Sequence, residues 1–288
     1  VRYDQYPGVA IDTIKGMDFS TDVDKRMSEA LFSNVKLREK DFSSEVLSST
    51  RFDDREGYAY LNAIFFQRHK RQLLNPVLLR LAVVAAILAV CAIVSLVVPA
   101  DSLSLGQNPG AILPFFVFIM YMASIGEKAC RAMFYNCDLA LLRYPFYRQR
   151  GAVLSNFMVR LKMIAGLNLI TAIAISGAVV AASVLFQWNW PITSIIPFVL
   201  SILVLSVFFS THHLFLYYVF QPYTAELGMK NPFFTAINTA VNMVCIFSLQ
   251  IHSAPSYFAL LVIVLTAAYT VIALILVHRY APQRFRVK

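Results

Sequence analysis

Charged residues are scarce in this chain. Only 14% of its 288 residues are charged, whereas a soluble domain carries about a quarter. Residues 1–80 hold most of that charge, and the sequence after them is nearly apolar. A bilayer core needs about 20 apolar residues for each helical span. The composition therefore predicts an all-α, polytopic membrane protein.

Lysine and arginine are absent from three connections between the apolar stretches. Those stretches are Leu81–Val98, Ala111–Ile125, Met163–Phe186, Ile192–Phe220, Phe233–Ile251 and Tyr257–Val277. The basic-free connections are Pro99–Gly110, Gln187–Pro191 and His252–Ser256, so all 25 basic residues lie elsewhere. Because positive charge resists translocation, the pattern predicts six transmembrane helices with cytoplasmic N- and C-termini. The net charge of +9 is thereby explained by topology, and no nucleic-acid partner is expected.

Motifs for catalysis and metal binding are also missing. The sequence has no glycine-rich phosphate loop followed by lysine, no metalloprotease helix motif, no nucleophile elbow and no paired metal-binding cysteines. We therefore expect no catalytic residue, metal site or cofactor in this chain, which is not predicted to be an enzyme. The last four apolar stretches contain no Asp, Glu, Lys or Arg. Ion-coupled carriers usually bury such a group in the membrane, so secondary active transport is disfavoured.

The polar N-terminal part divides into two predicted segments. Residues 1–56 form a cytoplasmic preface or linker, and residues 57–76 form an amphipathic connecting helix before the six-span domain, residues 77–288. The predicted interfacial residues of the connecting helix are Tyr58, Leu61, Phe65, Arg68, Lys70 and Arg71. The pattern favours a helix in the inner interface, with rings in the acyl boundary and cations on lipid phosphates. The alternative is a basic flank that only anchors the first span. Asn75-Pro76 is the predicted break before that span.

The main cytoplasmic loop, residues 127–162, mixes aromatic and basic side chains. Exposed aromatic rings can bury in a partner's groove while arginines pair with its carboxylates. The predicted docking residues are Asp138, Arg143, Tyr144, Pro145, Phe146, Arg148 and Arg150. The alternative is that this loop consists of cytoplasmic helix extensions whose charges only fix the topology.

Polar residues within the spans have two interpretations. They are Asn168, His212, Asn238 and Asn242. Polar groups inside a membrane often belong to a transport path, but asparagine side chains also join helices by hydrogen bonds. His212 is followed by His213, and neighbouring residues on a helix point about 100° apart, so the two rings cannot face one ligand.

Two segments resemble permeases of six-span bacterial ABC exporters. FYNCDLALLRYPFYRQRGAVLSNFMVRLKMI is similar to their segment between the second and third spans, and GYAYLNAIFFQRHKRQLLNPV is similar to their connecting helix. In that family an arginine-rich coupling helix rests in a groove of the ATPase subunit. Asp138, Leu141-Leu142, Tyr144-Pro145 and Arg148-Gln149-Arg150 stand at the matching places. Many such permeases have re-entrant helices before the last span. Only His252–Ser256 is available here, so the chain most resembles the less characterised exporter permeases.

The resemblance implies an exporter permease in the plasma membrane, expected to be a bacterial inner membrane. Its implied partners are membrane lipids, an ATPase subunit that binds ATP and Mg²⁺, and a second six-span bundle. That bundle would be a second copy or another half of the same polypeptide. The implied cargo is amphipathic, lipidic or peptidic. Two other functions stay open: a non-transporting scaffold or sensor, and a channel or ion-coupled carrier.

The topology can be tested with a reporter enzyme fused after Gln107. Because the connection that contains Gln107 has no basic residue, we expect the reporter to be accessible only from outside the cell. A reporter fused to the C-terminus serves as the control and should be accessible only from the cytoplasm. Cytoplasmic accessibility at Gln107 would refute the orientation.

Overall fold

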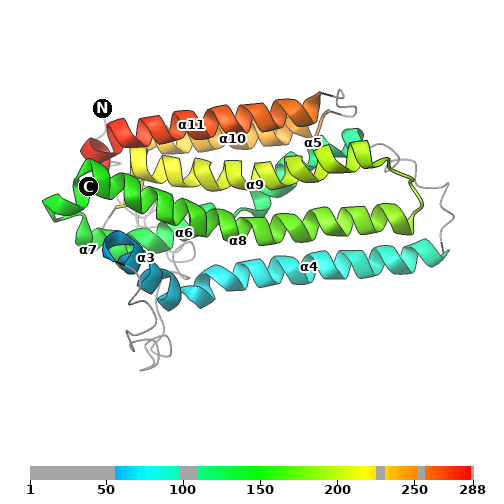
Figure 1. The fold of residues 1–288 in the computed structure, drawn as a ribbon, viewed down its shortest axis with the longest axis horizontal. Coiled ribbons are helices and arrows are strands. Elements are labelled where there is room, and N and C mark those ends of the chain that lie inside the picture. The colour runs from blue at the N-terminus through cyan, green and yellow to red at the C-terminus, as the bar shows by residue number, and fades with distance from the viewer. Residues whose placement is uncertain (1–55, 98–108, 225–230, 252–256, 287–288) are drawn as a thin grey trace, which may run out of the picture.

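A computed structural model describes residues 56–97, 109–224, 231–251 and 257–286 (Figure 1). Within these ranges the regular structure is helical and no β-strand is present. Among the described residues, five helical stretches are long and apolar enough to cross a membrane, and one of them, Pro109–Leu141, joins several shorter helices. The predicted all-α fold is thus confirmed, and the helices are compatible with a multi-pass membrane protein. The predicted preface lies outside the described residues, except for Glu56.

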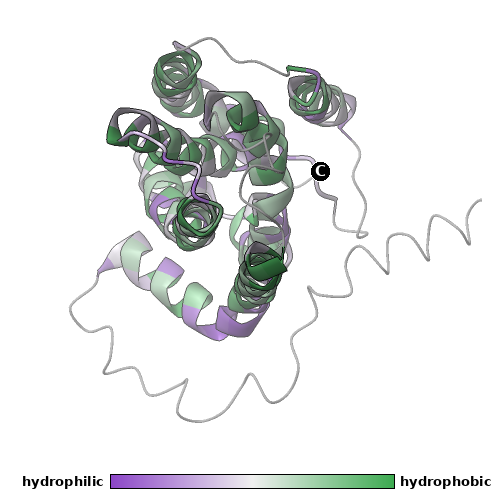
Figure 2. Ribbon diagram, turned by 90° about the vertical axis from the view of Figure 1, so that its right-hand side faces the viewer, coloured by the Kyte–Doolittle hydropathy of each residue, from purple (hydrophilic) through white to green (hydrophobic). Residues whose placement is uncertain are grey.

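Four long helices lie side by side and define the bundle. They are α4 (Lys70–Val97), α8 (Arg150–Leu185), α9 (Ile192–Phe220) and α11 (Phe258–Arg284) (Figure 1). Helix α9 is central because it contacts α8 and α11 as well as three shorter helices, and residues 209–219 are all buried. Most residues of the long helices are hydrophobic (Figure 2), as expected for helices that cross a bilayer.

The second predicted span contains a break in its helix. Helix α5 (Pro109–Ala123) ends before Ser124, and α6 (Gly126–Met133) begins two residues later. The side chain of Asn168 supports the break, since its Oδ1 accepts from the Ile125 amide (3.0 Å) and its Nδ2 donates to Ser124 Oγ (3.3 Å). Arg80 donates to the Ser124 carbonyl at 3.2 Å. Non-helical backbone at membrane depth is tolerated only where protein groups satisfy it in this way.

Most of the predicted cytoplasmic loop is helical. Helix α6 continues through a π-helical turn, η6 (Phe134–Asp138), into α7 (Leu139–Leu141). A 3₁₀ turn, η7 (Pro145–Arg148), then leads into α8, which begins at Arg150, well before the predicted span. Tyr144 has an extended backbone (φ −94°, ψ 132°), as proline requires of the residue before it. The chain therefore reverses direction within residues 142–149.

The connecting helix ends earlier than predicted. Helix α3 (Gly57–Arg68) stops at His69, and α4 runs without interruption through Pro76, so the predicted break at Asn75-Pro76 is wrong. The His69 Nδ1–H donates to the Phe65 carbonyl at 2.8 Å and so satisfies the last turn of α3. Pro76 is the seventh residue of α4, so its missing N–H removes one backbone hydrogen bond of the helix without ending it.

The apolar face of α3 packs against protein. Phe65 is only 4% exposed and lies in the protein core, so its ring is not free to enter the acyl boundary as predicted. Tyr58 and Leu61 are half-buried against the same core, and the interfacial position of the helix stays a prediction. Lys70 and Arg71 are exposed at the start of α4. Helix α3 packs on α8 because Asn62, on the buried face of α3, hydrogen-bonds within a polar cluster inside the bundle.

The fold predicts that Gly126 cannot accept a side chain. A Cβ at this position would lie 2.7 Å from His213 Cδ2 and 2.8 Å from His213 Cβ. We expect Gly126→Ala to destabilise the protein by about 1–3 kcal/mol, measured as a lower thermal unfolding midpoint in detergent. Gly166→Ala is the matched control, because no atom lies within 4 Å of its Cβ and alanine favours the helix by about 0.5–1 kcal/mol. Equal midpoints for both variants would contradict the close packing.

Candidate functional site

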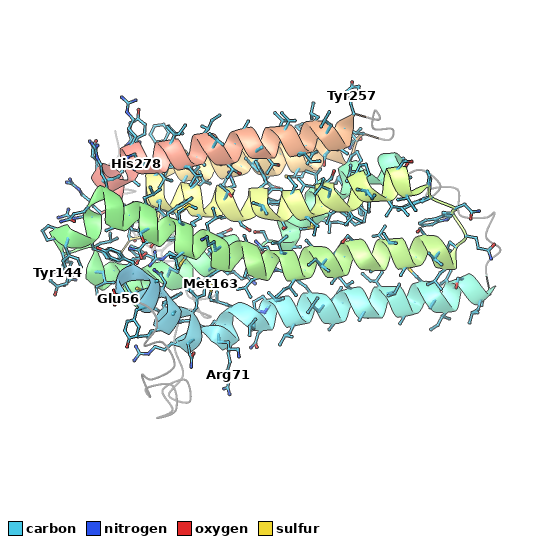
Figure 3. The ribbon with its side chains drawn as sticks, in the orientation of Figure 1. Glu56, Arg71, Tyr144, Met163, Tyr257 and His278 are labelled. Atoms are coloured by element: carbon cyan, nitrogen blue, oxygen red, sulfur yellow. The ribbon has the colours of Figure 1, made fainter. Side chains whose placement is uncertain are left out.

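An exposed turn forms the tip of the bundle. This docking turn, residues 143–150, joins α7 to α8 and includes η7. Figure 3 shows Tyr144 at one end of the molecule, which also carries Glu56 and His278, whereas Tyr257 lies at the opposite end. The docking turn thus lies outside the apolar part of the helices.

Aromatic and basic side chains of the docking turn point outward. Tyr144 is 54% exposed and Phe146 is 52% exposed, and their rings stack with centroids 5.8 Å apart. Arg143 and Arg150 are exposed beside them, and Arg148 is half-buried. Large rings flanked by guanidinium groups are the side chains that most often dominate binding energy in protein interfaces.

Asp138 does not belong to this surface, although the sequence placed it there. It is fully buried at the end of the π-helical turn and forms an ion pair with Arg160 of α8. The pair is bidentate: Arg160 Nη1 donates to Asp138 Oδ2 at 2.6 Å, and Nη2 donates to Oδ1 at 2.7 Å. This geometry is the strongest form of the guanidinium–carboxylate interaction.

The remaining groups of the pair bind side chains from three further elements. Tyr147 of η7 donates to Asp138 Oδ1 at 2.8 Å, and Tyr217 of α9 donates to Oδ2. Arg160 Nε donates to Asn62 Oδ1 of α3 at 2.8 Å, and its Nη1 donates to the Tyr218 hydroxyl of α9 at 2.9 Å. We call these six residues the inner network; they are Asn62, Asp138, Tyr147, Arg160, Tyr217 and Tyr218.

Neighbouring contacts attach the docking turn and α11 to the inner network. Asn62 Nδ2 donates to Asn156 Oδ1 of α8 at 2.6 Å, and the Tyr58 hydroxyl donates to the Phe146 carbonyl at 3.5 Å. At the end of α11, Phe285 stacks on Tyr218 with ring centroids 4.6 Å apart. The docking turn is therefore connected to α3, α8, α9 and α11 through one cluster.

Burial decides the protonation state of the tyrosine beside the docking turn. Removal from water raises the pKa of Tyr147 far above its usual value, and the nearby Arg160 guanidinium opposes this only in part. The Tyr147 hydroxyl therefore remains protonated and keeps donating to Asp138. Two charges buried together are stable only when hydrogen bonds satisfy their other polar atoms, and the inner network supplies those bonds.

Two of the predicted polar span residues join helices. Asn168 Nδ2 donates to Ser210 Oγ of α9 at 2.7 Å, and His212 Nδ1 lies 2.8 Å from the Tyr269 hydroxyl of α11. Asn238 of α10 (Pro232–Ser248) lies near Tyr121 and His212, but its buried Oδ1 accepts no hydrogen bond from the described residues. Asn242 is half-buried on the same helix. Helix packing thus accounts for Asn168 and His212.

Sequence reasoning missed Arg160 and its tyrosine partners. One signal was available, because Asp138 is the only acidic residue between Lys128 and Lys162. When a single carboxylate stands among many arginines just before an apolar helix, the pattern indicates a buried ion pair between that carboxylate and one of the arginines. The choice of Arg160 among those arginines, however, depends on how α8 packs against η6.

The described residues contain no group of three or more His, Cys, Asp or Glu side chains that could hold a metal ion. The chain matches no protein-family model, no curated protein and no solved structure.

The inner network predicts a strongly non-additive pair of substitutions. Arg160→Met leaves the Asp138 carboxylate buried without its partner, so we expect a loss of about 3–5 kcal/mol in the free energy of unfolding. Arg160→Met combined with Asp138→Leu removes both charges and should cost clearly less than the sum of the single changes. Denaturant unfolding in detergent measures both, with Arg150→Met at an exposed site as the control. Additive losses would show that the two residues are not coupled.

Proposed function

We propose that the chain is the membrane-spanning subunit of an ATP-driven exporter, powered by a separate cytoplasmic ATPase that binds the docking turn. The observation that carries the proposal is the combination of exposed stacked rings and arginines at the tip with a fully buried ion pair directly beneath them. An exposed aromatic pair held by a rigid cluster suits a surface that must transmit force. A turn that only separated two helices would not need to be tied to α3, α9 and α11.

The proposed topology has six crossings and cytoplasmic termini. Helix α10 provides the fifth crossing, although its 17 residues make it shorter than the five long helices. The docking turn lies at the end of the bundle where α11 ends, and α11 carries Arg279 and Arg284 in its last two turns. The described connection Gln187–Pro191, which has no basic residue, joins α8 to α9 at the other end. This distribution of charge supports a cytoplasmic docking turn.

In this proposal the ATPase binds ATP and Mg²⁺, and this chain supplies the path through the membrane. Closure of the ATPase would push on Tyr144 and Phe146, and the inner network would pass the movement to the inner ends of α8 and α9. The cargo would be amphipathic, lipidic or peptidic, and the membrane a bacterial inner membrane. A second bundle, from another copy or another half of the same polypeptide, would complete the path.

Two alternatives make different predictions for the same surface. A scaffold or sensor would bind a cytoplasmic protein through the docking turn without stimulating ATP hydrolysis when cargo is added. A channel or ion-coupled carrier would give ion currents or gradient-driven uptake in pure bilayers without any ATPase. The exporter alone requires both a bound ATPase and cargo-stimulated ATP hydrolysis.

The docking turn can be tested by reversing its exposed charge. We expect the natural chain to copurify with an ATPase subunit, and Arg143→Glu/Arg150→Glu to reduce that recovery at least about tenfold, since hot-spot arginines in protein interfaces are worth about 2 kcal/mol or more. Tyr144→Ala/Phe146→Ala should have a similar effect. ATP turnover of the purified complex should fall in parallel.

Arg279→Glu/Arg284→Glu is the control, because it reverses the same number of exposed charges on α11. Its ATPase recovery should match that of the natural chain. Unchanged association and ATP turnover in the docking-turn variants would refute the proposal, provided that the variants fold as judged by their thermal unfolding midpoints.

A further inference from the structure

Three consecutive residues of α9 each have a buried polar atom without a hydrogen-bond partner among the described residues. The atoms are Thr211 Oγ1, His212 Nε2 and His213 Nδ1, and none of the three side chains is more than 6% exposed. The other ring nitrogen of His212 is already taken, because Nδ1 lies 2.8 Å from the Tyr269 hydroxyl. Buried polar groups without partners are rare in native proteins, and each one calls for an explanation.

Helix α10 adds a fourth such atom beside this turn of α9. It is Asn238 Oδ1, and Asn238 lies near Tyr121 of α5 as well as near His212. The ring centroids of His212 and His213 are 5.5 Å apart, and those of Tyr121 and His213 are 6.4 Å apart. We call Tyr121, His212 and Asn238 the polar junction, which lies where α10 contacts α5 and α9.

The surroundings of the polar junction are apolar and nearly free of charge. Phe208 stacks on His212 with ring centroids 6.0 Å apart, and Phe209 packs edge-on against Tyr121 at 5.6 Å. Helices α5, α9 and α10 contain no Asp, Glu, Lys or Arg. Glu127 is close enough to act on Tyr121, but its carboxylate is paired within α6. A few convergent polar atoms between apolar and aromatic walls are typical of a site for a small molecule.

We propose that the polar junction binds the uncharged polar head of an amphiphile, a hydroxyl or amide group that both donates and accepts hydrogen bonds. Asn238 Oδ1 accepts, and His212 Nε2 donates or accepts according to its tautomer. A carboxylate or an ammonium group would leave water here without a counter-ion, which is very costly. In naming this amphiphile as the cargo, the inference rests on the proposed function, and it restricts the cargo to neutral amphiphiles.

The position of Asn238 gives such a molecule a way in from lipid. Asn238 lies about 9 Å from the start of α10 by the helical rise per residue, which is the cytoplasmic end in the proposed topology. Its side chain is only half-buried, and the buried residues of α10 are Phe234, Cys245 and Ser248. An amphiphile in the cytoplasmic leaflet therefore reaches Asn238 along the least tightly packed wall of the site, with its chain against apolar side chains.

Photolabelling of the purified chain in phosphatidylcholine vesicles tests the site without any ATPase. The probe is a monoacylglycerol with a diazirine next to its headgroup, and mass spectrometry locates the labelled residues. We expect labelling around residues 208–213 and 238 to be saturable and to be competed by excess unlabelled monoacylglycerol. The fatty acid and the alkylammonium of the same chain length should not compete. Labelling at the lipid-facing residues Val244 and Phe247, which are 66% and 68% exposed, should not saturate.

Substitutions at the polar junction test which side chains bind the head. Asn238→Leu and His212→Phe should each reduce the saturable labelling about fivefold, as expected for the loss of one hydrogen bond. Asn242→Leu is the matched control, because Asn242 is also half-buried on α10, and its labelling should equal that of the natural chain.

Thermal unfolding separates a binding site from a role in helix packing. Without ligand, the unfolding midpoint of Asn238→Leu should not fall, because Asn238 Oδ1 has no hydrogen bond to lose and leucine suits apolar surroundings. Excess monoacylglycerol should raise the midpoint of the natural chain and leave that of Asn238→Leu unchanged.

Four results would each overturn the inference: labelling that does not saturate, equal competition by the charged analogues, unchanged labelling in Asn238→Leu, or a lower midpoint of Asn238→Leu without ligand. In the first three cases the polar junction holds water only, and in the last Asn238 serves helix packing. Saturable binding in a chain that copurifies with no ATPase would refute only the proposed function. Loss of the binding with ATPase recovery intact would refute only this inference.

Discussion

The buried ion pair between Asp138 and Arg160 is the interaction on which the cytoplasmic end of this bundle depends. Both side chains are withdrawn from solvent, so each would be strongly destabilising without the other. The other polar atoms of this pair form hydrogen bonds with tyrosines from η7 and α9 and with an asparagine from α3. Elements far apart in sequence are consequently held in a single arrangement, because any displacement would leave a buried charge unsatisfied.

This arrangement contrasts with the rest of the molecule. Helix α4 contributes little buried surface along its apolar length, and α10 is held by few buried side chains. Apolar contacts between helices in a membrane carry no hydrophobic driving force, because lipid tails are as apolar as the side chains. The bundle therefore combines an end fixed by directional hydrogen bonds with two helices, α4 and α10, that bury few side chains. Such a distribution suits a protein that converts movement at its tip into rearrangement of its spans.

Two polar side chains within the apolar region are bonded to neighbouring elements in the same way. Asn168 supports the helix break at Ser124, and His212 joins α9 to α11. These contacts fix which helices are neighbours, and they explain why intramembrane polar residues need not mark a transport path.

The sequence by itself determined the fold class, the positions of the apolar helices and the side of the membrane expected for the basic residues. These properties depend on composition and on local charge, which are readable along one chain. It also predicted the exposed aromatic and basic side chains around Tyr144-Pro145, because these are local signals, whereas their binding to an ATPase stays a prediction. Only the tertiary structure decided that Asp138 is buried, that Arg160 is its partner, that Phe65 faces protein, and that α3 ends at His69. Each of these outcomes depends on which helices pack together, and a pairing between residues 22 positions apart or more leaves no local pattern in the sequence.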